Sequence, residues 1–482
     1  MSDLGPFSNY RLTARLELRN KIGVFASVTA LLARSKASLG AVDIVNVSRD
    51  KMVRDVTFDV AGEAHGERVI EKLRKLRGVH IVSVSDRIFL FHLGGKIEVH
   101  SRYPVTTRNR LSMIYTPGVA RVSQAIAQDP AKVYNLTMKS NSVAIVTDGS
   151  AVLGLGNIGS QAAVPVMEGK AVLFKEFANV NAYPICLATQ DPEEIIKTVC
   201  HIAPAFGGIN LEDISAPRCF EIEDKLKALL DIPVMHDDQH GTAIVILAAL
   251  KNALKITGKR IEDVKIVVNG LGAAGIACCR ILLAAGARRL IGADRQGVVL
   301  YGAPRELKMM RRSLYSCIHW SKPRMKLREA LAGADVFIGV SAGNVLKPGD
   351  LGCMKKNRIV FAMANPDPEV EPHKAMRLCR IFATGRSDFP NQINNALAFP
   401  AVFRGALDVR ASVINESMKL AAAEALAGLI GRDQLNEEYI IPSIFDKRIV
   451  ERVSAAVASA AMESGVARRK TQPGKSAEQN RS

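Results

Sequence analysis

Hydrophobic and polar positions divide residues 9–91 into short strands and helices. Strands with alternating side chains are predicted at residues 10–18, 42–48, 54–60 and 80–89. Helical spacing covers residues 24–35, with Val24, Val28, Leu31 and Leu32 on one face, and 67–79, which closes at Gly78. The order strand, helix, strand, strand, helix, strand is that of a ferredoxin-like α+β domain.

From about residue 96 the pattern changes to apolar strands that alternate with helices, which favours an α/β fold. Residues 264–269, 289–294, 334–341 and 358–365 are predicted strands of one parallel sheet, as in a Rossmann-type domain. The chain from Ala396 onward is rich in alanine and helical. We expect one α/β domain over 96–255 and a second, Rossmann-type domain over 256–430. A basic, disordered tail is expected at 466–482.

Composition is that of an ordinary globular protein, with 48% hydrophobic and 23% charged residues among 482. The longest apolar run, 243–250, is too short to span a bilayer, and the N-terminus lacks the apolar segment of a signal peptide. We therefore expect a cytoplasmic chain without membrane contact. Its eight cysteines are scattered and are expected to be reduced.

The net charge is +18, and much of it is local: residues 301–330 carry eight lysines and arginines against two glutamates. Such a cluster can mark a nucleic-acid surface. No basic stretch here is interleaved with aromatic residues, so we interpret it as a basic loop and expect no nucleic-acid partner.

The pattern Gly-x-Gly-x-x-Gly occurs twice, and the second copy has the context of a dinucleotide site. Gly270, Gly272 and Gly275 follow the strand 264–269 and open a helix through Ala273 and Ala274. Asp294 lies about twenty residues on, where a carboxylate binds the adenosine ribose and repels the 2′-phosphate of NADP. This favours NAD, although Arg295 beside it leaves NADP possible.

The first copy, Gly154, Gly156 and Gly159, also follows an apolar strand and precedes a helix, with Glu176 near the position of the acid. Periodicity alone does not decide between the two loops. Lys170 follows the first loop at a place where a nucleotide loop needs no lysine.

Two pairs of acids stand inside apolar stretches: Glu212 with Asp213, and Asp237 with Asp238. Buried carboxylates need a partner, and oxygen ligands from separate segments suit Mg²⁺ or Mn²⁺. The alternative is that these acids cap helices or pair with Arg218.

A series of motifs between about residues 100 and 430 resembles malic enzymes, in the order found in that family. They are YTPGVA at 115–120, TDGSAVLGLGNIG at 147–159, FGGINLEDISAPRCFEIE at 206–223, HDDQHGTA at 236–243, VVNGLGAAG at 267–275, ANPDPE at 364–369 and GRSDFPNQINNALAFP at 385–400. The match is to the short bacterial type. It implies that 96–255 is the catalytic domain and that 256–430 is the NAD-binding domain, whose last helices return to the catalytic domain.

The resemblance implies oxidative decarboxylation of L-malate to pyruvate and CO₂ with reduction of NAD(P)⁺. It implies that Tyr115 is the general acid and Lys170 the general base. Glu212, Asp213 and Asp238 would be the metal ligands, with Asp237 in support. Gly270, Gly272, Ala273, Ala274, Gly275, Asp294 and Asn365 would lie at the cofactor, and Asn365, Asn395 and nearby Asn394 at the substrate. We expect the pKa of Lys170 to be lowered by the cation and by burial. The first glycine loop then only shapes the site.

Residues 18–26 (LRNKIGVFA), where the first helix begins, resemble an ACT domain. That resemblance implies a small effector, such as an amino acid, at residues 9–91, and a homo-oligomer of two or more chains. A dimerisation module without a ligand is the alternative.

The chain departs from the malic enzyme pattern at 341–344, where Ser-Ala-Gly-Asn replaces Ser-Ala-Pro-Gly, and in the basic segment 301–330. Both put the choice of cofactor in doubt. Two other functions stay open: a malolactic enzyme that converts L-malate to L-lactate, and a catalytically inactive sensor. The intact Tyr115, Lys170 and acidic residues argue against the sensor.

Overall fold

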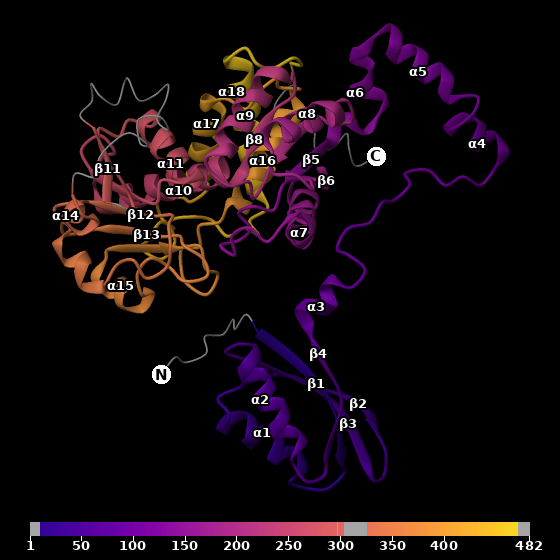
Figure 1. The fold of residues 1–482 in the computed structure, drawn as a ribbon, viewed down its shortest axis with the longest axis vertical. Helices are drawn as coiled ribbons and strands as arrows, with labels where there is room; N and C mark the ends of the chain where they lie inside the picture. The colour runs from indigo at the N-terminus through magenta and orange to yellow at the C-terminus, as the bar shows by residue number, and fades with distance from the viewer. Residues whose placement is uncertain (1–9, 296, 303–324, 471–482) are drawn as a thin grey trace. The chain divides into compact units, whose positions relative to one another are not determined.

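A computed structural model describes residues 10–295, 297–302 and 325–470 and divides the chain into two compact units, Met1–Glu98 and Val99–Ser482 (Figure 1). Most of the basic segment, residues 303–324, lies outside the described residues. In the described part of the chain, no helix is long and apolar enough to cross a membrane.

The first unit is an antiparallel sheet in the order β2-β3-β1-β4 with two helices packed against one face (Figure 1). Leu16, Leu32, Phe58 and Leu73 are fully buried in its core. The elements are β1 (Tyr10–Arg19), α1 (Val24–Arg34), β2 (Ser38–Val47), β3 (Lys51–Val60), α2 (Glu63–Arg74), β4 (Val79–Asp86) and α3 (Arg87–His92). The ferredoxin-like prediction is confirmed.

The last predicted strand, 80–89, extends too far. Strand β4 ends at Asp86, whose carboxylate accepts a hydrogen bond from the Ile88 backbone N–H (2.7 Å) and begins helix α3. An aspartate at a helix N-cap satisfies one of the free amides there, and this local bond replaces continued strand pairing.

The second unit begins with a helical arm, residues 99–128, that contains α4 (Arg108–Ile114) and α5 (Val119–Gln128). Neither helix has a buried residue, and Figure 1 shows both away from the sheets of the unit. Three short helical segments, η1 (Pro130–Lys132), α6 (Val133–Leu136) and η2 (Met138–Asn141), follow the arm. They lead into the first of the two sheets of this second unit, which we call the first sheet.

That sheet is parallel, with four strands in the order β6-β5-β7-β8. Its strands are β5 (Ser142–Thr147), β6 (Asn181–Cys186), β7 (Gly208–Leu211) and β8 (Val234–His236). The connecting helices are α7 (Ser160–Ala178), α8 (Pro192–Ile202), η3 (Ala203–Ala205) and α9 (Arg218–Leu229), and α10 (Asp237–Thr257) follows β8. Because all four strands are parallel, their carboxyl ends meet at one edge.

The second sheet has the order β11-β10-β9-β12-β13-β14, parallel except for β11, and confirms the predicted Rossmann-type domain. Its strands are β9 (Lys265–Asn269), β10 (Arg289–Asp294), β11 (Gly297–Gly302), β12 (Val336–Gly339), β13 (Ile359–Ala362) and β14 (Ile381–Thr384), with α11 (Ala273–Ala284), α14 (Leu327–Leu331), η4 (Pro348–Cys353) and α15 (Pro372–Leu378) between them. The strand order reverses at β9, which places a ligand crevice at its carboxyl end.

The C-terminal segment packs back against helices α7, α10 and α11 of this unit. Its elements are η5 (Asn395–Leu397), α16 (Phe399–Asp408), α17 (Glu416–Ala427) and α18 (Arg448–Glu463). Phe399 and Phe403 of α16 contact Phe174 of α7, with ring centroids 4.7 and 5.5 Å apart. Within the expected disordered tail, residues 466–470 are ordered: Arg468 forms an ion pair with Asp231 at 2.8 Å. Residues 471–482 lie outside the described part.

Candidate active site

Two pairs of carboxylates meet at the carboxyl edge of the first sheet. Glu212 and Asp213 follow β7, and Asp237 and Asp238 open α10 after the neighbouring strand β8. Ligand atoms of Glu212, Asp213 and Asp238 lie within 4.8 Å of one another. The Asp213 backbone N–H donates to Asp238 Oδ2 at 2.8 Å and joins the two strand ends. Three of the four acids can therefore hold one cation.

Lys170 of α7 lies against the same cluster and is only 8% exposed. Its Nζ donates to Asp237 Oδ2 at 2.6 Å, lies 2.8 Å from Glu212 Oε1, and stands 4.3 Å from the ring centre of Phe399. Burial lowers the pKa of Lys170, but the charges of Asp237 and Glu212 outweigh burial and raise it. The lowering predicted for Lys170 beside a bound cation stays a prediction.

The acids carry more negative charge than one lysine balances. Burial, more than any other cause, raises the pKa of Asp213 to about 7 and that of Asp237 to about 6, and it raises the pKa of Glu212 as well. Among the described residues, the buried Oδ2 of Asp213 has no hydrogen-bond partner. Clustered carboxylate oxygens with an unpartnered buried atom fit a hard divalent cation such as Mg²⁺ or Mn²⁺.

Arg218, the alternative partner of these acids, instead forms an ion pair with Asp148 at 2.9 Å. Asp148 follows β5 and also accepts from the Ser150 hydroxyl at 2.5 Å, and Ser150 Oγ accepts the Ser215 backbone N–H at 2.9 Å. This network fastens the first glycine loop to the segment that follows Glu212 and Asp213.

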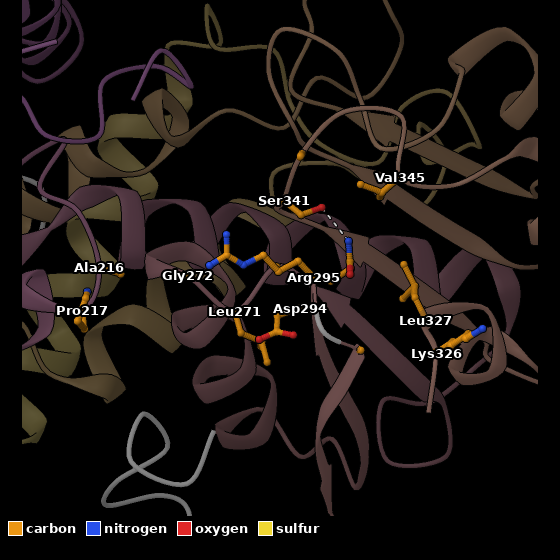
Figure 2. A pocket seen from close by; sticks show the side chains of 14 residues that line it. Ala216, Pro217, Leu271, Gly272, Asp294, Arg295, Lys326, Leu327, Ser341 and Val345 are labelled. Carbon is orange, nitrogen blue, oxygen red and sulfur yellow. Dashed lines mark hydrogen bonds between the residues drawn. The ribbon is translucent and has the colours of Figure 1, made fainter. Parts of the chain in front are cut away.

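The second glycine loop lines a pocket at the carboxyl end of β9 (Figure 2). Of the predicted cofactor residues, it contains Gly270, Gly272 and Asp294. The other residues that line it are Ala216, Pro217, Asn269, Leu271, Arg295, Gly297, Lys326, Leu327, Ser341, Ala342 and Val345, most of which no sequence motif indicated. Ala273 and Ala274 begin α11 behind the loop, and Gly275 is buried there.

The first glycine loop is exposed over residues 153–158 and approaches another segment closely at Gly154. A Cβ atom added to Gly154 would lie 2.8 Å from the Asn365 backbone oxygen, in the segment that follows β13. The loop then enters α7, which carries Lys170.

The predicted asparagines occupy different positions. The Asn395 side chain donates to Asp237 Oδ2 at 2.7 Å and so belongs to the acidic cluster. Asn394 accepts the Ala396 backbone N–H at 2.9 Å and caps η5. Asn365 is exposed in the turn after β13.

Tyr115 is not brought to the cluster within this single chain. It ends α4 on the arm and is 67% exposed. Other apolar side chains of the arm are exposed with it: Val99, Tyr103, Val105, Leu111, Met113 and Ile114. The sequence pattern contained no sign that this arm would lie apart.

Three family models match the chain: "ACT domain" over residues 7–83, "Malic enzyme, N-terminal domain" over 94–194 and 188–227, and "Malic enzyme, NAD binding domain" over 239–466. A protein described as an NAD-dependent malic enzyme from Geobacillus stearothermophilus is 55% identical, and the match covers 96% of each chain.

A protein described as a bifunctional malic/malolactic enzyme from Bacillus subtilis is 51% identical, over 80% of this chain and 95% of its own. Among solved structures, an NAD-dependent malic enzyme from Thermotoga maritima superposes with a TM-score of 0.72 at 46% identity. That match covers 78% of this chain and 99% of the other.

The geometry of the second loop predicts that Gly275 tolerates no side chain. A Cβ atom at Gly275 would collide with the Gly270 carbonyl oxygen, whereas one at Gly352, in η4 and outside the pocket, would meet nothing within 4 Å. We expect Gly275→Ala to weaken binding of NAD⁺ at least about tenfold, because the loop must open to relieve the collision. Calorimetric titration of this variant and of the control Gly352→Ala checks this; equal affinities would contradict it.

Proposed function

Because the chain belongs to the malic enzyme family, we propose that it oxidises and decarboxylates L-malate to pyruvate and CO₂ while it reduces NAD⁺ to NADH. The observation that carries this proposal is the buried lysine, Lys170, held at 2.6 and 2.8 Å from two carboxylates beside a cluster that can hold a cation. A base next to a cation site suits the removal of a hydroxyl proton.

Glu212, Asp213 and Asp238 would hold Mg²⁺ or Mn²⁺, which fits the raised pKa values of Glu212 and Asp213 and the unpartnered oxygen of Asp213. When bound, the cation supplies Lewis-acid polarisation of the substrate oxygen and positive charge among the acids that raise the pKa of Lys170. Asp237 does not belong to this trio. It receives hydrogen bonds from Lys170 and Asn395 and so keeps Nζ directed at the cluster.

In the proposed reaction, Lys170 Nζ takes the C2 hydroxyl proton of malate as the C2 hydride passes to the nicotinamide. Loss of CO₂ from the resulting keto acid leaves the enolate of pyruvate, and Tyr115 gives a proton to its C3 atom. Asn365 and Asn395 would orient the substrate and the nicotinamide ribose. Asp294, at the end of β10 in the pocket, favours NAD over NADP.

A second activity, conversion of L-malate to L-lactate, is the rival because one relative is described as a bifunctional malic/malolactic enzyme. Incubation with L-malate, Mn²⁺ and NAD⁺ or NADP⁺, with pyruvate, lactate and reduced cofactor assayed together, distinguishes the two. We expect equal amounts of pyruvate and NADH. Lactate without NADH would establish the rival, and no product with either cofactor would contradict both.

In the same assay we expect Lys170→Ala and Asp238→Ala to reduce turnover at least about a hundredfold without loss of folding, because each removes a group used in the chemical step. Asp238→Ala should also lose binding of Mn²⁺ in the absence of substrate. Lys175→Ala on the same helix and Asp224→Ala on α9, both at exposed positions, are the matched controls. Near-normal turnover in either active-site variant would refute its assigned role.

We propose that a second copy of the chain covers the arm and that Tyr115 acts in the active site of that copy. The arm exposes a run of apolar side chains and has no buried residue in α4 or α5. Exposed apolar surface of this kind marks a protein contact.

Hybrid dimers test this arrangement. Tyr115→Phe and Lys170→Ala chains, co-expressed with different tags, should each be inactive alone. A purified hybrid has one intact site if Tyr115 acts in the partner copy, so we expect about half of wild-type turnover. An inactive hybrid would show that each Tyr115 serves its own chain, and a monomeric wild-type protein would refute the dimer.

For the ACT domain, with its separate core, we propose binding of a small effector, an amino acid being the first class to test. Titration of the full chain with single amino acids should change the KM for malate in at least one case. That change should disappear when residues 1–98 are removed. If no amino acid changes malate kinetics, this effector class is wrong.

A further inference from the structure

Behind the cofactor pocket lies a buried carboxylate, Glu369, that has no place in the proposed reaction. It belongs to the segment that follows β13 and is fully buried, with 0% exposure. The pocket-lining residues do not include it, so its carboxylate does not face the space that the dinucleotide would fill.

Glu369 connects the ends of two strands through three hydrogen bonds. Its Oε1 accepts the Ser341 backbone N–H at 2.8 Å and the Ser341 hydroxyl at 3.2 Å, just beyond the end of β12. Its Oε2 accepts the Ala364 backbone N–H at 3.0 Å, one residue before Asn365. Burial raises the pKa of Glu369, and the hydrogen bonds from Ala364 and Ser341 oppose this by favouring the carboxylate.

A third strand end joins the network through Ser341. The Asn269 side chain, at the end of β9, donates to Ser341 Oγ at 2.7 Å, the bond drawn in Figure 2. Since the Ser341 hydroxyl donates to Glu369, its oxygen is available to accept from Asn269. Asn269 and Ser341 both line the pocket, and Glu369 is hydrogen-bonded directly to Ser341 from the side away from the pocket.

Backbone hydrogen bonds connect the same two segments. Leu346 N–H donates to the Glu369 carbonyl at 2.9 Å, and Asn344 N–H donates to the Pro368 carbonyl at 2.9 Å. The carboxyl group occupies space left by Gly339, where an added Cβ would collide with it. The loop 341–346, which departs from the usual family pattern, is therefore held to segment 364–369 along its length.

We propose that Glu369 is a positioning residue for the cofactor: it holds the turns at Ser341 and Ala364 against Asn269, so that the pocket keeps the shape that the dinucleotide requires. The inference rests on the proposed function, because it takes the pocket to be the NAD site. Glu369 itself touches neither cofactor nor substrate.

Glu369→Gln is the sharpest test because it keeps size and shape. A glutamine has one acceptor oxygen and one NH₂ group, so a donor must face either Ala364 N–H or the two donors of Ser341. A buried N–H donor without an acceptor costs free energy, so the turns at Ser341 and Ala364 would no longer be held together and the pocket would lose its shape. We expect the dissociation constant for NAD⁺, measured by calorimetry on the full chain, to rise about tenfold or more. Binding of Mn²⁺ alone should stay within about twofold, since its ligands lie on the other sheet.

Asp335→Asn is the matched control. Asp335 is a buried carboxylate at the opposite end of β12, where it accepts the Lys265 backbone N–H at 3.0 Å and pairs with Lys259 and Lys355. The Asp335→Asn substitution should lower the melting temperature and leave the affinity for NAD⁺ unchanged. If Glu369→Gln behaves like Asp335→Asn, with lower melting temperature and NAD⁺ affinity within about twofold of wild type, a purely structural role replaces the positioning role.

Should Glu369→Gln fail to fold, Ser341→Ala removes the hydroxyl that links Glu369 to Asn269. It should raise the NAD⁺ dissociation constant about threefold, and an unchanged constant would overturn the inference. Binding of NAD⁺ to the unmodified chain distinguishes failure of this inference from failure of the proposed function. If it does not bind NAD⁺, the proposed function fails together with this inference. If it binds NAD⁺ as Glu369→Gln does, only this inference fails.

Discussion

The unbalanced negative charge at the carboxyl edge of the first sheet is the constraint on which the site depends. Glu212, Asp213, Asp237 and Asp238 gather around one buried lysine. Burying a carboxylate without a compensating charge costs several kcal/mol, so this arrangement is unfavourable unless protons or a cation neutralise it. The raised pKa values of Glu212, Asp213 and Asp237 express that cost. A site that suits a divalent cation is thus also one that is strained without it.

The two glycine loops, so similar in sequence, have different surroundings. The second loop ends a strand at which the sheet order reverses, and Gly270 and Gly272 border an open pocket. The first loop is exposed over residues 153–158. A Cβ atom at Gly154 would meet the Asn365 backbone oxygen, whereas one at Gly156 or Gly159 would meet nothing within 4 Å. The helix that follows this loop carries Lys170 to the acids.

Local patterns predicted the parts of the structure that depend on local chemistry. The β9 strand, the glycine loop and the helix behind it were predicted from neighbouring residues, as was the order of elements in the first unit. Features set by distant contacts were not. The raised pKa of Lys170 comes from Asp237 and Glu212, which lie on other elements. The early end of β4 depends on one capping bond at Asp86, and the pocket walls at Pro217 and Ser341 come from separate loops. The grouping of the acids was implied by family resemblance; spacing alone left pairing with Arg218 open.

The acid and the base proposed for the reaction differ in how firmly the single chain holds them. Lys170 is fixed by two carboxylates, an aromatic ring and a buried helix, so its position is determined by the core. Tyr115 stands on an arm whose helices bury nothing, so contacts within its own chain do not determine its position. A group that donates a proton needs a defined place within hydrogen-bond reach of the substrate. In the proposed arrangement a second copy of the chain supplies the surface that orders the arm, and the exposed apolar side chains beside Tyr115 support this. Assembly would then be a condition for complete catalysis, whereas the acidic cluster and the pocket at the second glycine loop are already formed within each chain.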